Sequence, residues 1–95
     1  MIAAQRFLRL RGEEQLRTVE NALKRVLERQ RGTACTVRPC AVARELGLPP
    51  APTVLSVLRH CMERLREIEA NGSRWRLLAA SKTRKNHLRF YYVKA

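Results

Sequence analysis

Acidic residues are scarce in this chain of 95 residues: 8 Asp+Glu stand against 20 Lys+Arg, and the formal net charge is +12. Long apolar runs are lacking too, because no stretch approaches the roughly 18 residues that a membrane-spanning helix needs. Residues 1–6 have neither the apolar segment nor the small-residue cleavage site of a secretory signal. We therefore expect an intracellular, cytoplasmic protein without a membrane span.

Cysteine and histidine are few, and their spacing suits neither a metal site nor a catalytic site. Cys35, Cys40 and Cys61 form no Cys-x-x-Cys pair, and His60 and His87 stand apart. The sequence has no Ser/His/Asp pattern, no glycine-rich phosphate loop and no paired carboxylates in an apolar setting. We expect no enzymatic activity, no cofactor and no metal, with reduced thiols that pack as small hydrophobic groups. A Cys35–Cys40 disulfide is the alternative if the source is a hyperthermophile.

The basic residues gather at the two ends of the chain. Residues 1–12 and 73–95 together hold ten of the twelve excess positive charges and no acidic residue. Arginine outnumbers lysine 16 to 4, and guanidinium is the better fork for phosphate oxygens and guanine edges. Hydrophobic residues still make up 45% of the chain, so it can bury a core. This pattern favours a folded domain that binds a polyanion, most often nucleic acid.

The strongest helical pattern lies between Gly12 and Gly32, and it predicts a helix over residues 13–31. Its apolar residues follow a 3-4-3 spacing, and Gly32 suits a left-handed cap at its end. The stripe is heptad-like, and a domain this small has little to cover it, so we expect it to form a homodimer interface. The interface residues are Leu16, Val19, Leu23 and Val26. Residues 7–11 fit a short strand or an added helical turn equally well.

Two further helices and a hairpin are predicted downstream. Residues 33–38 read as a brief strand and residues 39–46 as a short helix with Pro39 at its first position, ended by Gly47. The proline-rich segment 48–52 leads into a longer helix, from Pro52 to about Ala70. From residue 73 the apolar period changes to two, which predicts a β-hairpin with a basic loop over residues 80–87. In its strands, Trp75, Leu77 and Ala79 share one side, as do Leu88, Phe90 and Tyr92.

This order of elements resembles the winged helix-turn-helix family of DNA-binding domains, in particular small archaeal and archaeal-virus transcription factors. The closest local likeness is Val42-Ala43-Arg44-Glu45-Leu46-Gly47-Leu48 followed by Thr53-Val54-Leu55-Ser56-Val57-Leu58-Arg59. The resemblance implies an α+β fold in which three helices meet a small antiparallel sheet and a C-terminal hairpin wing. Residues 1–95 then form one domain: a basic extension (1–12), a first helix (13–31), the helix-turn-helix (39–71) and the wing (73–93).

The same resemblance implies which side chains meet duplex DNA. The second helix of such a motif presents its polar N-terminal face to the major groove, and the wing contacts the backbone or the minor groove. On the helix these residues are Thr53, Ser56, Val57, Arg59, His60 and Arg64. On the hairpin they are Arg74, Arg76, Lys82, Arg84, Lys85, Asn86 and Arg89. The predicted function is a sequence-specific DNA-binding regulator that acts as a homodimer.

Two alternatives stay open beside this reading. The predicted recognition face lacks Asn and Gln, the usual readers of adenine, which favours a sequence-indifferent chromatin or RNA-binding protein. A protein-interaction module is the third possibility, and the acid-free C-terminal segment counts against it. A regulator keeps a large ratio of specific to non-specific affinity, whereas a non-specific binder shows salt dependence with little preference among sequences.

Overall fold

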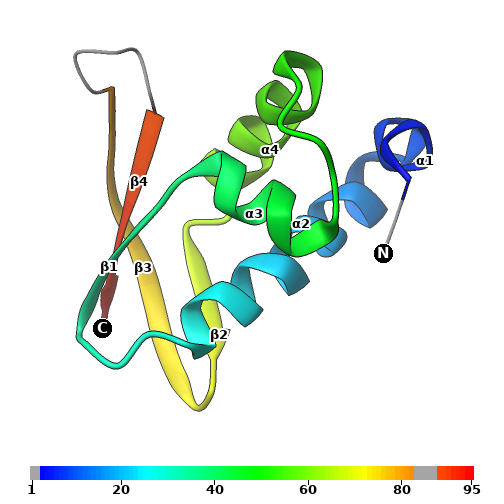
Figure 1. Ribbon diagram of the computed structural model, residues 1–95. Coiled ribbons are helices and arrows are strands. Elements are labelled where there is room, and N and C mark those ends of the chain that lie inside the picture. Colours follow the sequence, from blue (N-terminus) through cyan, green and yellow to red (C-terminus); the bar gives the residue numbers. More distant parts are fainter. Residues whose placement is uncertain (1–2, 83–87) are drawn as a thin grey trace.

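The computed structural model describes residues 3–82 and 88–95, and it shows an α+β fold (Figure 1). The helices in these ranges are α1 (Ala4–Arg9), α2 (Gly12–Glu28), α3 (Pro39–Leu46) and α4 (Pro52–Arg64). The strands are β1 (Ala34–Val37), β2 (Glu67–Ala70), β3 (Ser73–Lys82) and β4 (Leu88–Lys94). The predicted α+β class is confirmed, with one helix and one strand more than the sequence suggested.

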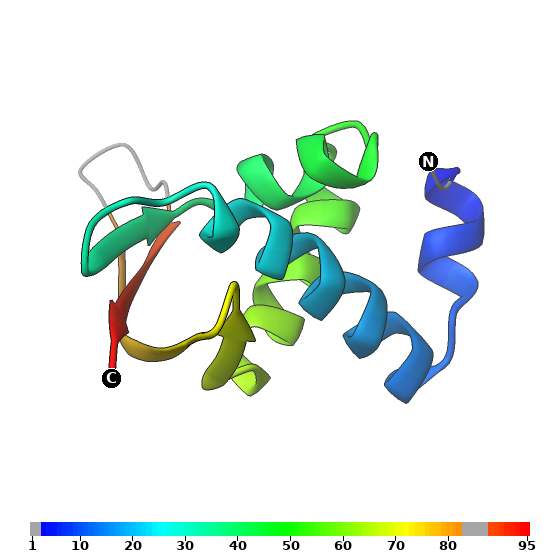
Figure 2. The ribbon, with the colours of Figure 1, turned by 90° about the horizontal axis from the view of Figure 1, so that it is seen from below.

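The four strands form one antiparallel sheet in the order β1-β4-β3-β2. Side chains alternate across it: Trp75 on β3 and Phe90 on β4 are buried toward the helices, while Arg76 and Tyr91 point the other way. All four helices lie on one side of the sheet, and α1 is the farthest from it (Figures 1 and 2). The sheet therefore has an inner face against the helices and an outer face that no described element covers.

The core is one cluster that joins α2 to α3, α4 and the inner face of the sheet. Val19 and Leu23 are 0% exposed and Val26 is 8% exposed, and the half-buried Leu16 packs against the same cluster. The predicted dimer stripe of α2 is thus covered within its own chain, so these residues are not free to meet a second copy. The prediction failed because α3, α4 and β2 all converge on α2, which periodicity alone does not reveal.

The sequence left residues 7–11 open between a short strand and an added helical turn, and the structure places residues 7–9 in helix α1. Phe7 on α1 is 0% exposed and belongs to the core, and this buried ring holds α1 to the rest of the molecule. The first predicted helix also ends earlier than expected, at Glu28. Arg29 caps it in the right-handed region, so Gly32 does not supply the left-handed cap that the sequence predicted. The predictions for β1 and for α3 with Pro39 at its start are confirmed.

The longer helix expected up to Ala70 is wrong in its last third. α4 ends at Arg64, and residues 67–70 form strand β2, which pairs with β3 so that Ile68 lies opposite Trp75. Leu65 and Ile68 are three apart, a spacing that fits a helical stripe, but Ile68 and Ala70 also alternate with two exposed glutamates. Asn71 and Gly72 have positive φ (51° and 75°), as a two-residue hairpin turn requires. The pairing with β3 decided between the two periods.

A β-bulge interrupts β3. Leu77 pairs with Tyr92 and Ala79 pairs with Tyr91, so Leu78 is an extra residue without a partner on β4. Ala79 therefore lies on the outer face with Tyr91, and not beside Trp75 and Leu77 as simple alternation predicted. The predicted grouping on β4 holds for Phe90 and Tyr92, which are both buried in the core.

Candidate nucleic-acid interface

The acidic residues of the chain are confined to one part of the fold. All eight lie on α2, on β2 or in the C-terminal halves of α3 and α4. Among the described residues, the ion pairs use these glutamates: Lys24–Glu20, Arg25–Glu45, Arg29–Glu45 and Arg74–Glu69. The N-terminal ends of α3 and α4 carry no acidic residue, so the basic side chains at those ends face little competition for an anion.

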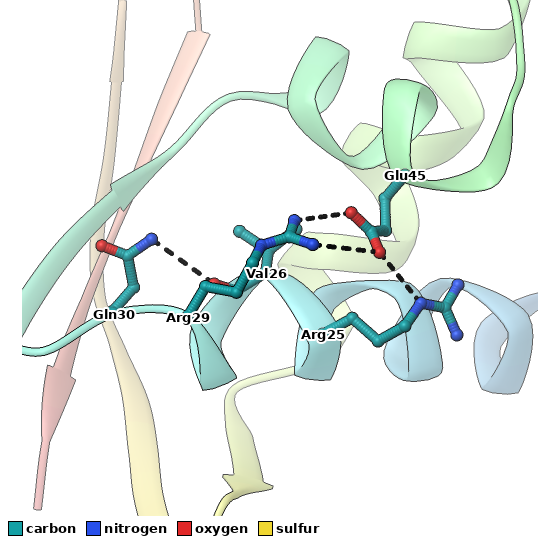
Figure 3. Close-up of polar contacts among 5 residues, drawn as sticks. All are labelled: Arg25, Val26, Arg29, Gln30 and Glu45. Atoms are coloured by element: carbon teal, nitrogen blue, oxygen red, sulfur yellow. Dashed lines mark hydrogen bonds and ion pairs between the residues drawn. The ribbon is translucent and has the colours of Figure 1, made fainter.

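Arg25 on α2 and Arg29 at the C-terminal cap of α2 both bind Glu45 on α3 (Figure 3). The Arg29 guanidinium donates to both oxygens of Glu45, at 2.6 and 3.4 Å, and Arg25 Nε donates to Glu45 Oε1 at 3.0 Å. The hydrogen bond from Arg29 holds the pKa of the Glu45 carboxyl below its usual range, with a further contribution from Arg25, although burial opposes the shift. This clamp links α3 to the C-terminal end of α2.

The turn between α3 and α4 is set by Gly47. Its φ of 72° is left-handed, which glycine adopts without strain, and Leu48 N donates to Ala43 O at 2.8 Å to close the helix. Pro39 and Pro52 begin α3 and α4, and neither helix has a side-chain cap at its N-terminus. The positive ends of two helix dipoles are thereby left without a side-chain acceptor.

α4 divides into a core face and a solvent face. Val54, Leu58, Cys61 and Met62 are buried against the core. The predicted contact residues Thr53, Ser56, His60 and Arg64 are all exposed, whereas Val57 and Arg59 are half-buried. The polar side of α4 therefore faces solvent, as the sequence predicted. Val57 and Arg59, near the middle of the helix, are less exposed than the other predicted contact residues.

Arg59 borders a cleft of about 260 Å³ between α3, α4 and the start of β4. The lining includes Arg38 and Cys40 from the start of α3, Ser56 and Arg59 from α4, and Leu88 from β4. Arg59 Nε is buried and has no hydrogen-bond partner among the residues that the structure describes. Two guanidinium groups, a hydroxyl and the N-terminal ends of two helices thus converge on one hollow, an arrangement suited to an anion.

Sequence reasoning missed Arg38 and Cys40 as parts of this site. The available signal was Pro39, which marks a helix start and so places Arg38 at the positive end of a dipole. Nothing in the sequence indicated that the start of α3 and the middle of α4 share a cleft, because that depends on how the two helices cross.

The hairpin residues do not gather at this cleft as a group. Arg74 and Arg76 are exposed on the outer face of the sheet, away from the helices, and Arg74 pairs with Glu69 at 3.2 Å. Lys82 is exposed and is the register partner of Leu88, but it does not line the cleft. Arg89 is half-buried, and its buried Nε has no hydrogen-bond partner in the described part of the chain. Arg84, Lys85 and Asn86 lie outside the described residues.

The thiols show no catalytic environment. Burial raises the pKa of both the Cys35 and the Cys61 thiol, which lowers their nucleophilicity at neutral pH. The three cysteines are free, including the pair Cys35 and Cys40 considered for a disulfide. Within residues 3–82 and 88–95, no three His, Cys, Asp or Glu side chains group as metal ligands do. No helix in these ranges combines the length and apolarity required to cross a membrane.

No protein-family model, curated protein or solved structure matches this chain. Its function must therefore be argued from its own geometry and charge.

Proposed function

We propose that this protein is a sequence-specific double-stranded DNA-binding protein of the winged helix-turn-helix type, acting as a transcriptional regulator. The observation that carries the proposal is the cleft beside α4, where the buried Arg59 Nε has no partner within residues 3–82 and 88–95 and Arg38 lies at the start of α3. Both helix N-termini open toward it without an acidic side chain. This is the chemistry that holds a phosphate and directs the exposed side of α4 into a groove.

The roles of the two cleft arginines differ. Arg38 stands at the helix start, where phosphate is its natural partner, because a helix dipole and a guanidinium together favour a fixed anion. Arg59 lies on the same side of α4 as Ser56, about two turns from the helix start at Pro52, and a guanidinium there can pair with guanine O6 and N7. Arg38 then positions the protein on the duplex, while Arg59 reads sequence.

The second candidate is non-specific binding to nucleic acid. One observation favours it: the solvent face of α4 offers Thr53, Ser56, His60 and Arg64, and none of these is the amide side chain that reads adenine bidentately. A protein of this kind uses the same basic surface on phosphates alone, with little difference between sequences.

Selection from a random duplex library, followed by fluorescence anisotropy on the selected and a scrambled duplex, tests the proposal. Arg59→Ala is expected to cost about 1–3 kcal/mol on the selected duplex and much less on the scrambled one. Arg38→Ala is expected to weaken both duplexes about equally, because a phosphate contact is blind to sequence.

Arg17→Ala is the matched control. It removes the same charge from an exposed position on α2, away from the cleft, and is expected to have a much smaller effect on either duplex. If Arg59→Ala weakens both duplexes equally, the non-specific candidate replaces the regulator. If none of the three variants differs from the parent, the cleft is not the binding site.

A further inference from the structure

The outer face of the sheet carries an apolar surface that no described part of the chain covers. Leu78 is 67% exposed, and only one other large apolar side chain in the described ranges, Leu8 at 39%, is classed as exposed. Leu78 borders a shallow hollow of about 400 Å³ with Thr36, Tyr91 and Val93, so three strands contribute to it. A continuous apolar surface of this kind on a charged protein marks an interaction site.

The exposure of Leu78 follows from the register of β3. The bulge leaves Leu78 without a partner on β4, and the pairing with β2 stops at Arg76 and Glu67. Leu78 therefore lacks a cross-strand neighbour on either side. A polar residue would be the ordinary choice at such a position, since a leucine gains nothing there within its own chain.

The charges of β2 and of the adjoining stretch of β3 balance one another, unlike those of the molecule as a whole. β2 contributes Glu67 and Glu69 to the outer face, and the adjoining stretch of β3 contributes Arg74 and Arg76. Arg89 adds a positive charge at the far end, where β4 begins. The net charge of the chain is +12, so two copies repel each other overall, but the two glutamates give this face acidic groups that can meet the arginines of a second copy.

We propose that the outer face of the sheet is the surface through which two copies of this chain associate, face to face about a two-fold axis. Such an axis makes the contact self-complementary: Leu78 of one copy enters the hollow of the other, and the glutamates of each β2 meet the arginines of the opposing β3. The carboxylates also disfavour nucleic acid on this face. The inference concerns the oligomeric state and does not depend on DNA binding, and it leaves α4 and its cleft open on the other side.

The size of the face sets the strength of the association. Each strand residue covers about 4.8 Å (the strand spacing) by about 3.3 Å (the rise per residue) of the sheet. The residues of β1, β2, β3 and β4 together therefore give the outer face a footprint of roughly 400 Å². Stable complexes bury about 800 Å² per partner. The pair is therefore weak in free solution and forms at high micromolar concentration, or when one duplex holds two copies close together.

Sedimentation velocity of the parent protein up to about 1 mM, without DNA, is the first experiment. A concentration-dependent shift from monomer to dimer is expected, and Leu78→Ser should raise the dissociation constant at least tenfold, since it removes the apolar anchor. Leu8→Ser on α1 is the control, which should leave the dissociation constant unchanged. A parent that stays monomeric throughout overturns the inference, as does an equal effect of the two serine variants.

Charge exchange tests the two-fold contact directly. The double variants E67K/E69K and R74E/R76E should each self-associate less than the parent, and an equimolar mixture of the two should recover dimers. Both variants should stay folded but melt somewhat below the parent, because each places two like-charged pairs directly opposite one another across β2 and β3. The loss of the Arg74–Glu69 pair itself should cost little, since its side chains are 58% and 73% exposed. A mixture that remains monomeric although both variants are folded overturns the two-fold arrangement.

Two further measurements distinguish self-association through this face from nucleic-acid binding on the same face and from the proposed DNA-binding function. If single-stranded DNA shifts the amide resonances around Tyr91 at concentrations where the protein does not self-associate, the face binds nucleic acid and the inference fails. Duplex affinity per monomer should be the same for Leu78→Ser and the parent. A parent that dimerises but binds no duplex contradicts the proposed function and leaves the dimer face supported.

Discussion

The Tyr92 hydroxyl is buried in the core, and no described residue forms a hydrogen bond with it. A buried polar group of this kind costs about 1–3 kcal/mol of folding free energy, because it loses water and gains nothing in exchange. Burial, with a smaller contribution from Cys35, raises the pKa of this phenol far above its usual value. The ring of Tyr92 therefore stabilises the core, while its hydroxyl works against it.

Tyr92→Phe is expected to leave the free energy of unfolding unchanged or to raise it by about 1 kcal/mol at neutral pH. The folded-state pKa is raised, so the parent should keep its stability below pH ~10 and lose it as the pH rises above that value. Tyr92→Phe should lose less stability over the same alkaline range. Urea unfolding at several pH values measures both effects, with Tyr91→Phe as the control that keeps the buried hydroxyl. A loss of more than about 1 kcal/mol at neutral pH would show that the hydroxyl has a partner.

At the scale of the elements, the contact between α2 and α3 combines apolar packing with the Arg25–Glu45–Arg29 clamp. Glu45 is itself largely covered, at 16% exposure, whereas the two arginines are 49% and 62% exposed. The clamp is thus screened by solvent on its arginine side. Its main effect is to fix the direction of α3, and through the turn at Gly47 that of α4.

Glu45→Gln is expected to lower the melting temperature near pH 7 by roughly a few degrees. The folded-state pKa of Glu45 is lowered, so the clamp contributes fully above the unfolded-state value of about 4.3 and is lost as the pH falls through the folded-state value. The difference between parent and variant should therefore shrink below about pH 4. Calorimetry between pH 3 and 7 measures it, and Glu28→Gln, which removes one exposed carboxylate from α2, is the control. A difference that persists at pH 3 would mean that the amide disturbs packing.

For the whole molecule, the dominant property is a charge of +12 with its acidic residues kept away from the N-terminal ends of α3 and α4. Each DNA phosphate neutralised by Lys or Arg releases counterions and contributes a slope of about −0.9 to log K against log[salt]. The slope of log K against log[salt] therefore gives the approximate number of phosphate contacts.

We expect binding to duplex DNA with a slope steeper than about −4, corresponding to more than four phosphate contacts. Anisotropy titrations from roughly 50 to 300 mM salt measure this slope. The Arg38→Ala variant should reduce its magnitude by about one, and the Arg17→Ala control should change it less. A chain that ignores duplex DNA at about 50 mM salt would contradict the proposed function.

Local signals in the sequence were sufficient for several elements. Pro39 and Gly47 bracket α3, and the alternation of Phe90 and Tyr92 identifies the inner face of β4, because capping and period-two burial depend on neighbours within a few residues. The exposed side of α4 followed from the apolar stripe on its other side. The excess of positive charge follows from composition, and its concentration near the chain ends follows from the order of residues in the sequence.

Only the tertiary structure decided which helices and strands pack against one another. Leu23 fits a dimer seam as well as a core, and only the convergence of α3, α4 and β2 on α2 made it core. Ile68 fits a helix or a strand, and pairing with Trp75 made it a strand. Arg38 and Arg59 are 21 positions apart, and the crossing of α3 and α4 brought them to one cleft. Periodicity indicates which side of a helix or strand is apolar. The element that packs against that side depends on contacts between residues far apart in the chain, and a short stretch of sequence does not determine these contacts.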